Sequence, residues 1–140
     1  MALNAQGPLV GIRILEVAEG LAGSYSGTLL SDLGADVIKV EPREGDYTRK
    51  LGPFKKGERA YFISYNRGKR GIALDLTKEQ ARQIVKALAA KSDIFIESLE
   101  PGEIEALGLD YEEIKKVNHS IIYGSVSCYG RTGPLSKYPG

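Results

Sequence analysis

Five short runs of mostly apolar, β-branched residues recur along the chain of 140 residues, and helical patterns separate most of them. The runs are Ile12–Val17, Asp36–Glu41, Gly71–Leu76, Asp93–Ser98 and Ser120–Ser127. All except Gly71–Leu76 are dominated by apolar residues rather than by clean alternation, as is typical of strands covered on both faces. Strands that alternate with helices favour a parallel sheet with right-handed crossovers. The sequence therefore predicts an α/β fold, a Rossmann-like parallel sheet with helices on both faces.

Helical periodicity is clearest over Thr77–Lys91. Thr77, with Gln80 three residues later, predicts a capping box at the start of this helix. Asp110 is predicted to cap another helix through its side chain. The remaining predicted helices are Gly23–Leu33, Pro101–Gly108 and Asp110–Val117.

Two segments break the alternation of strands and helices. Pro42–Tyr61 is a long connection rich in Gly, Lys, Arg and Pro, and connections of this length are usually functional or mobile. Residues 130–140 lack periodicity and predict an irregular tail or a truncation point. No helix follows the fifth strand, although native chains normally cover a strand edge. The alternatives are a short domain with a frayed end and a fragment whose sheet is incomplete at the carboxyl end; we expect the fragment.

Composition argues against several classes of protein. Nineteen basic residues against eighteen acidic ones give a net charge of +1, which favours neither nucleic acid nor a membrane as partner. One cysteine and one histidine form no cluster of metal ligands, so we expect no metal site. The amino terminus lacks the apolar core of a signal peptide, and no apolar stretch is long enough to span a bilayer. These features predict a cytoplasmic protein.

In parallel α/β sheets, ligands bind at the carboxyl ends of the strands. Gly20, Gly23 and Gly27 follow the first strand, but their spacing differs from the dinucleotide fingerprint. The loop could present backbone N–H groups to an anion, or it could be a tight turn. Glu41 closes the second strand, where a ribose-binding acid usually lies. The predicted strand ends are Val17–Gly23, Glu41–Gly45, Leu74–Thr77, Glu97–Gly102 and Ser127–Gly133.

Other polar residues allow two interpretations each. Arg67, Lys69 and Arg70 could grip a phosphate or form a solvated surface cluster, and Lys39 is expected to face solvent as well. Cys128 is expected to be a buried structural thiol, because no histidine is close in sequence to activate it. Composition and spacing indicate no acid–base pair, so no catalytic residue is predicted.

Ordered motifs along essentially the whole chain resemble one family. They are Pro8–Glu16, Leu21–Gly23, Leu30–Glu41, Gly45–Arg49, Tyr61–Arg70, Leu74–Leu76, Ser92–Ser98 with Pro101–Gly102, Ile121–Ser125 and Gly130–Pro134. Together they resemble the class III coenzyme A (CoA) transferases, which include formyl-CoA and carnitine CoA-transferases and the α-methylacyl-CoA racemases. The resemblance makes residues 1–140 the amino-terminal part of a CoA-binding large domain.

The resemblance also implies contacts with CoA. Arg43 would lie near the adenine and its phosphates, and Leu74, Asp75, Leu76 and Thr77 would line the adenosine. Glu97 and Ser98 would lie beside the pantetheine or the diphosphate. The loop Leu21, Ala22 and Gly23 would face the thioester.

Catalysis in the family lies beyond the position that matches Gly140. Transferases use an aspartate that attacks the acyl-CoA thioester, and racemases use a histidine and an aspartate. The resemblance therefore implies an inactive fragment of an enzyme that transfers CoA between carboxylic acids, with acyl-CoA and a carboxylic acid as partners, no covalently bound cofactor and a homodimeric full-length form. Alternatives are a fragment of a racemase, a non-catalytic CoA- or nucleotide-binding module, and a half that works only with a separately encoded chain.

Overall fold

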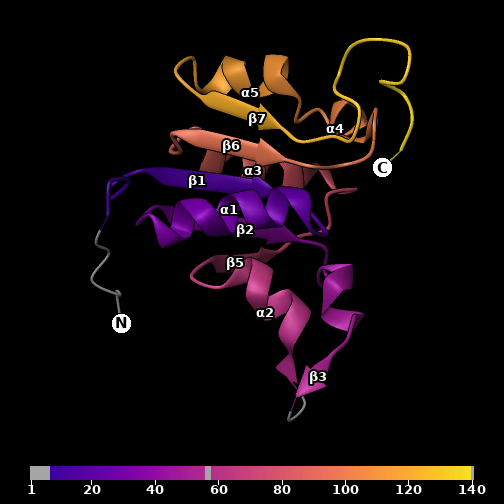
Figure 1. Ribbon diagram of the computed structural model, residues 1–140. Coiled ribbons are helices and arrows are strands. Elements are labelled where there is room, and N and C mark those ends of the chain that lie inside the picture. Colours follow the sequence, from indigo (N-terminus) through magenta and orange to yellow (C-terminus); the bar gives the residue numbers. More distant parts are fainter. Residues whose placement is uncertain (1–6, 56–57, 140) are drawn as a thin grey trace.

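The computed structural model describes residues 7–55 and 58–139, which form a five-stranded sheet, a short two-stranded hairpin and helices on both faces of the sheet (Figure 1). The sheet has the strand order β5-β2-β1-β6-β7, and its four pairings are all parallel. Its strands are β1 (Arg13–Val17), β2 (Asp36–Glu41), β5 (Arg70–Ala73), β6 (Ile94–Glu97) and β7 (Ile122–Ser125). Each predicted strand overlaps one of these, and the predicted Rossmann-like α/β fold is confirmed.

Two apolar clusters hold the helices against the sheet. On one face, Ile14 and Val37 pack in a cluster with Leu30 of α1 (Ala22–Asp32). On the other, Leu15 and Phe95 pack with Val85 of α3 (Glu79–Ala89) and with residues of α4 (Glu103–Ala106) and α5 (Tyr111–Val117). Neighbouring residues of a strand point to opposite faces, so β1 contributes to both clusters. This explains why its sequence lacks clean alternation.

The two predicted helix caps have different outcomes. Asp110 caps α5 as predicted, since its Oδ1 accepts hydrogen bonds from the backbone N–H groups of Glu112 (3.0 Å) and Glu113 (3.3 Å). The capping box at Thr77 is wrong. Lys78 is the N-cap of α3 and makes no side-chain capping bond. The Thr77 hydroxyl donates instead to Asp75 Oδ1 at 2.6 Å, because an aspartate two residues earlier offers a closer acceptor.

The connection Pro42–Tyr61 is more structured than a loop. It contains η1 (Tyr47–Lys50), β3 (Phe54–Lys55), β4 (Glu58–Arg59) and the start of α2 (Ala60–Asn66), and Figure 1 shows this segment extending beyond the β5 edge. Aromatic and β-branched residues make up most of α2, and these are weak helix formers. Tertiary contacts compensate: Thr28 Oγ1 donates to the Tyr65 carbonyl at 2.5 Å, and Arg49 lies 3.6 Å from the centroid of the Phe62 ring.

The predicted burial of two side chains, Lys39 and Cys128, is wrong. Lys39 was expected to face solvent but is 1% exposed, because Glu16, its register partner on β1, supplies a buried countercharge. Cys128 was expected to be buried but is exposed, because it lies in the irregular segment after β7 rather than in the strand. His119 lies in a turn between α5 and β7.

The segment after β7 forms turns and bends through residue 139, while Gly140 lies outside the described residues. Within residues 7–55 and 58–139, no helix combines the length and the apolar character needed to cross a bilayer.

Candidate functional site

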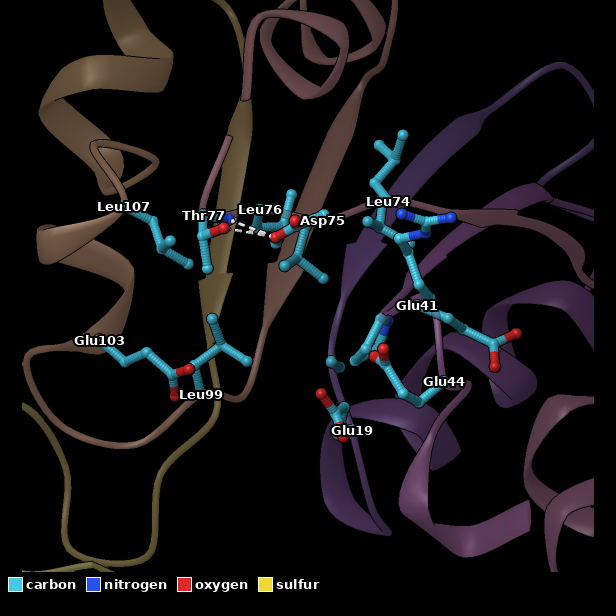
Figure 2. A pocket seen from close by; sticks show the side chains of 15 residues that line it. Glu19, Glu41, Glu44, Leu74, Asp75, Leu76, Thr77, Leu99, Glu103 and Leu107 are labelled. Carbon is cyan, nitrogen blue, oxygen red and sulfur yellow. Dashed lines mark hydrogen bonds between the residues drawn. The ribbon is translucent and has the colours of Figure 1, made fainter. Parts of the chain in front are cut away.

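A cavity of about 490 Å³ opens at the carboxyl ends of the sheet strands, where β1, β2, β5 and β6 meet α4 (Figure 2). The strand order reverses at β1, and open α/β sheets bind ligands at such a reversal. Figure 2 shows acidic side chains along one wall and Leu99, Glu103 and Leu107 opposite them. The lining residues are Val17, Ala18, Glu19, Val40, Glu41, Pro42, Arg43, Glu44, Leu74, Asp75, Leu76, Thr77, Leu99, Glu103 and Leu107.

Five of the predicted site residues line this cavity, namely Arg43 and the run Leu74–Thr77. The Leu74 N–H donates to the Glu41 carbonyl at 2.8 Å, which ties the end of β5 to the end of β2. Asp75 Oδ1 accepts from both the N–H (3.1 Å) and the hydroxyl of Thr77, and the hydroxyl bond lowers the pKa of Asp75. The turn that begins α3 is therefore held with Asp75 as a carboxylate.

Glu97 and Ser98 lie beside the cavity rather than in its lining. Glu97 is fully buried: one oxygen pairs with Arg131, and the other accepts the Leu99 N–H at 3.1 Å. Its carboxylate thus anchors the segment after β7 and the turn after β6. Ser98 is half-buried, and its hydroxyl donates to the Glu19 carbonyl at 3.4 Å.

Leu21, Ala22 and Gly23 form the start of α1 and also lie outside the lining. A Cβ on Gly23 would lie 2.7 Å from the Cβ atoms of both Ala18 and Ser98, which is closer than side chains pack. Glycine therefore lets α1 approach the end of β6. Ala18 lines the cavity, so this loop borders the cavity without facing into it.

Sequence reasoning missed Glu19, Glu44 and Glu103 of the cavity, whereas Asp75 was a predicted site residue and Glu41 was noted at the end of its strand. Among the lining residues, the carboxylates are Glu19, Glu41, Glu44, Asp75 and Glu103, against the guanidinium of Arg43. The rule that ligands bind at strand ends does select the segments carrying Glu19 and Glu41, but it does not say which side chains turn inward.

The carboxyls of the acidic wall differ in their titration. Burial raises the pKa of Glu19, and the negative charge of Asp46 adds to this although Lys39 opposes it. Burial acts in the same direction on Glu41, but hydrogen bonds from Arg49 and from the Asp46 N–H outweigh it and lower the pKa of Glu41. Glu41 is thus committed to Arg49, and this disfavours its expected role as a ribose acceptor.

The basic cluster does not act as one anion site. Arg67 pairs with Asp32, and Arg70 pairs with Asp36 at 2.6 Å, both at exposed positions. The side chain of Lys69 is 2% exposed and pairs with Glu16 at 2.7 Å. Neither predicted interpretation, a phosphate-binding site or a solvated surface cluster, describes all three residues, because each cation pairs with a different carboxylate.

The cavity combines apolar lining residues with an acidic wall. Val17, Val40, Leu74, Leu76 and Leu99 are among the apolar lining residues. Such a lining suits a neutral group that offers hydrogen-bond donors, and its carboxylates repel anions. Among residues 7–55 and 58–139, no group of three or more His, Cys, Asp and Glu side chains is arranged to hold a metal ion.

The chain is similar to known structures and proteins over nearly its whole length. A CAIB/BAIF family protein from Brucella suis is 44% identical, with a TM-score of 0.90 over 96% of this chain and 37% of that chain. Succinyl-CoA:glutarate CoA-transferase from Mus musculus is 47% identical over 95% of this chain and 31% of that protein. Acetyl-CoA:oxalate CoA-transferase from Acetobacter aceti is 42% identical over 96% of this chain and 35% of that protein.

The chain thus spans about a third of the length of these relatives. The family model for CoA-transferase family III matches residues 9–140, which includes every strand of the sheet and every residue that lines the cavity. The chain therefore belongs to CoA-transferase family III.

Proposed function

We propose that this chain is the CoA-binding, amino-terminal part of an enzyme that transfers CoA between carboxylic acids. The observation that carries the proposal is the cavity at the strand ends, because Arg43 and Leu74–Thr77 gather there from β2 and β5. Membership of the family and the names of the relatives, which are CoA-transferases, support this choice over a racemase.

The charge of the cavity indicates which part of CoA it would hold. The acidic wall repels phosphate groups but can accept hydrogen bonds from the amino group and the hydroxyls of adenosine. We therefore assign the adenosine to the apolar residues Leu74 and Leu76, and the phosphates to the part of the cavity beside Arg43. A guanidinium is well suited to bind phosphate oxygens in pairs.

The reaction itself would need residues that follow position 140 in the full-length enzyme. There, an aspartate carboxylate would attack the carbonyl carbon of the acyl-CoA, expelling the CoA thiolate and leaving a mixed anhydride. The thiolate would then attack the aspartyl carbonyl, giving an enzyme thioester and releasing the first acid. The second acid would reverse these steps. In this proposal the full-length enzyme is a cytoplasmic homodimer, and residues 1–140 contribute binding and no nucleophile.

Isothermal titration calorimetry of the 140-residue chain with CoA and with NAD tests the binding proposal. We expect saturable binding of CoA and weaker or no binding of NAD, since Glu41 is held by Arg49. Binding of NAD without binding of CoA would overturn it. The chain alone should not transfer CoA from an acyl-CoA to a carboxylic acid, and measurable turnover would contradict the placement of the nucleophile.

A further inference from the structure

Two acidic and two basic side chains are buried beneath the first turns of α1, namely Glu16, Asp46, Lys39 and Lys69. They lie on the face of the sheet opposite the cluster that contains Leu15 and Phe95. Glu16 and Asp46 are 0% exposed, and Lys39 is 1% exposed. Lys39 Nζ lies 3.0 Å from a carboxylate oxygen of each. Lys69 Nζ lies 2.7 Å from the second oxygen of Glu16 and donates to the carbonyl of Ser24 at 2.6 Å. The two carboxylates and the two ammonium groups balance one another.

Lys39 connects two segments that line the cavity. Its ammonium donates to the Ala18 carbonyl at 2.5 Å and to Ser24 Oγ at 2.9 Å, both in the loop and helix start after β1. Its other partner, Asp46, lies in the connection after β2, and the Asp46 N–H donates to Glu41 Oε2 at 3.1 Å. Ala18 and Glu41 both line the cavity.

Lys39 does not itself face the cavity. Val40, the next residue of β2, lines the cavity, and successive side chains of a strand point to opposite faces. Any influence of Lys39 on a ligand must therefore pass through the two segments that it joins.

We propose that Lys39 is a positioning residue, whose ammonium fixes the segment after β1 and the segment after β2 relative to each other and so sets the shape of the cavity. Desolvation offsets much of the attraction within a buried ion pair, so such groups are a weak source of stability. Their directional hydrogen bonds nevertheless specify one geometry. Two chain segments that bind the same buried ammonium group can adopt few separations.

The test compares wild type with the double variant Lys39→Met/Asp46→Asn, which removes one charge of each sign and leaves Glu16 paired with Lys69. Amide hydrogen exchange of the ligand-free chain is the main measurement. We expect exchange to rise at least about tenfold over residues 18–25 and 41–50 and to stay unchanged in β6 and α3. Unchanged exchange in those two segments would overturn the proposal. A uniform rise along the whole chain would also overturn it, since that outcome indicates a purely structural role.

The matched control is Lys86→Met/Glu113→Gln, which makes comparable substitutions in an accessible ion pair between α3 and α5. It should leave exchange in both segments unchanged. If the first double variant does not fold, the single variant Asp46→Asn replaces it. We then expect hydrogen exchange to rise in the same two segments, by a smaller factor. Its Asn side chain can still accept the hydrogen bonds that Asp46 Oδ1 receives from Thr48.

A second readout rests on the proposed function. Titration with CoA should give a dissociation constant about tenfold higher for the Lys39→Met/Asp46→Asn variant than for wild type and for the control variant, a loss of about 1.4 kcal/mol. If wild type does not bind CoA, the proposed function fails while the exchange measurement still decides the role of Lys39. If CoA binds equally well to all three chains, the cavity does not depend on Lys39 and the inference is wrong.

Discussion

Arg49 holds Glu41 through two parallel hydrogen bonds, from Nε to Oε2 at 2.7 Å and from Nη2 to Oε1 at 2.8 Å. The pair joins η1 to the end of β2, at the wall of the cavity. A bidentate guanidinium–carboxylate pair is stronger than an ordinary surface ion pair and fixes both partners. An acid in this place usually binds ribose in dinucleotide-binding sheets, but here it holds the protein's own loop.

The pair makes stability depend on pH in a predictable direction. Since the pKa of Glu41 is lowered on folding, its contribution is complete above the unfolded-state value of about 4.3 and is lost as the pH falls through the lower folded-state value. Glu41→Gln should reduce the free energy of unfolding by about 1–3 kcal/mol at pH 7. The difference from wild type should shrink at pH 3, because this pH lies below the unfolded-state pKa and the unfolded chain then binds a proton at Glu41. Urea unfolding at both pH values measures this.

Glu44→Gln is the matched control, because Glu44 is an exposed neighbour on the same loop. It should change the free energy of unfolding by no more than about 0.5 kcal/mol at either pH. An equal loss for Glu41→Gln at pH 7 and pH 3 would show that packing, rather than charge, accounts for its effect.

Arg43 offers the most direct test of the phosphate assignment. Arg43→Ala should raise the dissociation constant for CoA about tenfold or more, because a charge-assisted hydrogen bond to phosphate contributes about 1.5–3 kcal/mol. Because dephospho-CoA and adenosine carry fewer phosphate groups than CoA, calorimetry should show a smaller effect of Arg43→Ala on their dissociation constants. Lys91→Ala removes the same charge from an exposed position between α3 and the start of β6, at the end of the sheet opposite the cavity. It should leave CoA affinity unchanged.

Gly27 in α1 tests the packing above the buried charges. Alanine is preferred to glycine in a helix by about 1 kcal/mol, so propensity alone predicts stabilisation. A Cβ on Gly27, however, would lie 1.9 Å from Glu16 Oε2. The free-energy cost of displacing α1 or the buried carboxylate exceeds the gain in helix propensity. Gly27→Ala should therefore lower the free energy of unfolding by about 2 kcal/mol or more. Ser26→Ala, one position away in the same helix, should stay within about 0.5 kcal/mol of wild type.

The cap of α5 gives a smaller, cleaner effect. Asp110→Ala removes the acceptor for two backbone N–H groups and should destabilise the chain by about 1 kcal/mol in thermal or urea unfolding. Asp110→Asn keeps an oxygen acceptor and should retain most of the stability. A loss of equal size for both variants would indicate that the charge of Asp110, rather than its hydrogen bonds, supports the helix.

Local patterns in the sequence were enough to predict the sheet and most helices. The strands that contain Leu15 and Phe95 are rich in apolar residues because both faces of the sheet are covered. Helix α2 could not be predicted in this way. Most of its residues are weak helix formers, and contacts with Thr28 and Arg49, which are distant in sequence, hold it in place.

The candidate site was predictable in part for the same reason. Arg43 and Leu74–Thr77 follow strands, and a parallel sheet brings such segments to one edge. Glu97 also follows the rule, yet its side chain turns inward to Arg131, a residue in the irregular segment after β7. The direction of a side chain at a strand end depends on partners that strand periodicity does not reveal.

The amino-acid sequence by itself determined the order of the five sheet strands and of most helices, the strand ends where a ligand would bind, and the resemblance to a family. The tertiary structure alone decided that Glu16 and Lys39 form a buried pair. A charged residue within a strand is normally expected at the surface, since burying an unpaired charge is costly. Only the parallel register of β1 and β2 places the two charges together, and only α1 closing over them removes them from water.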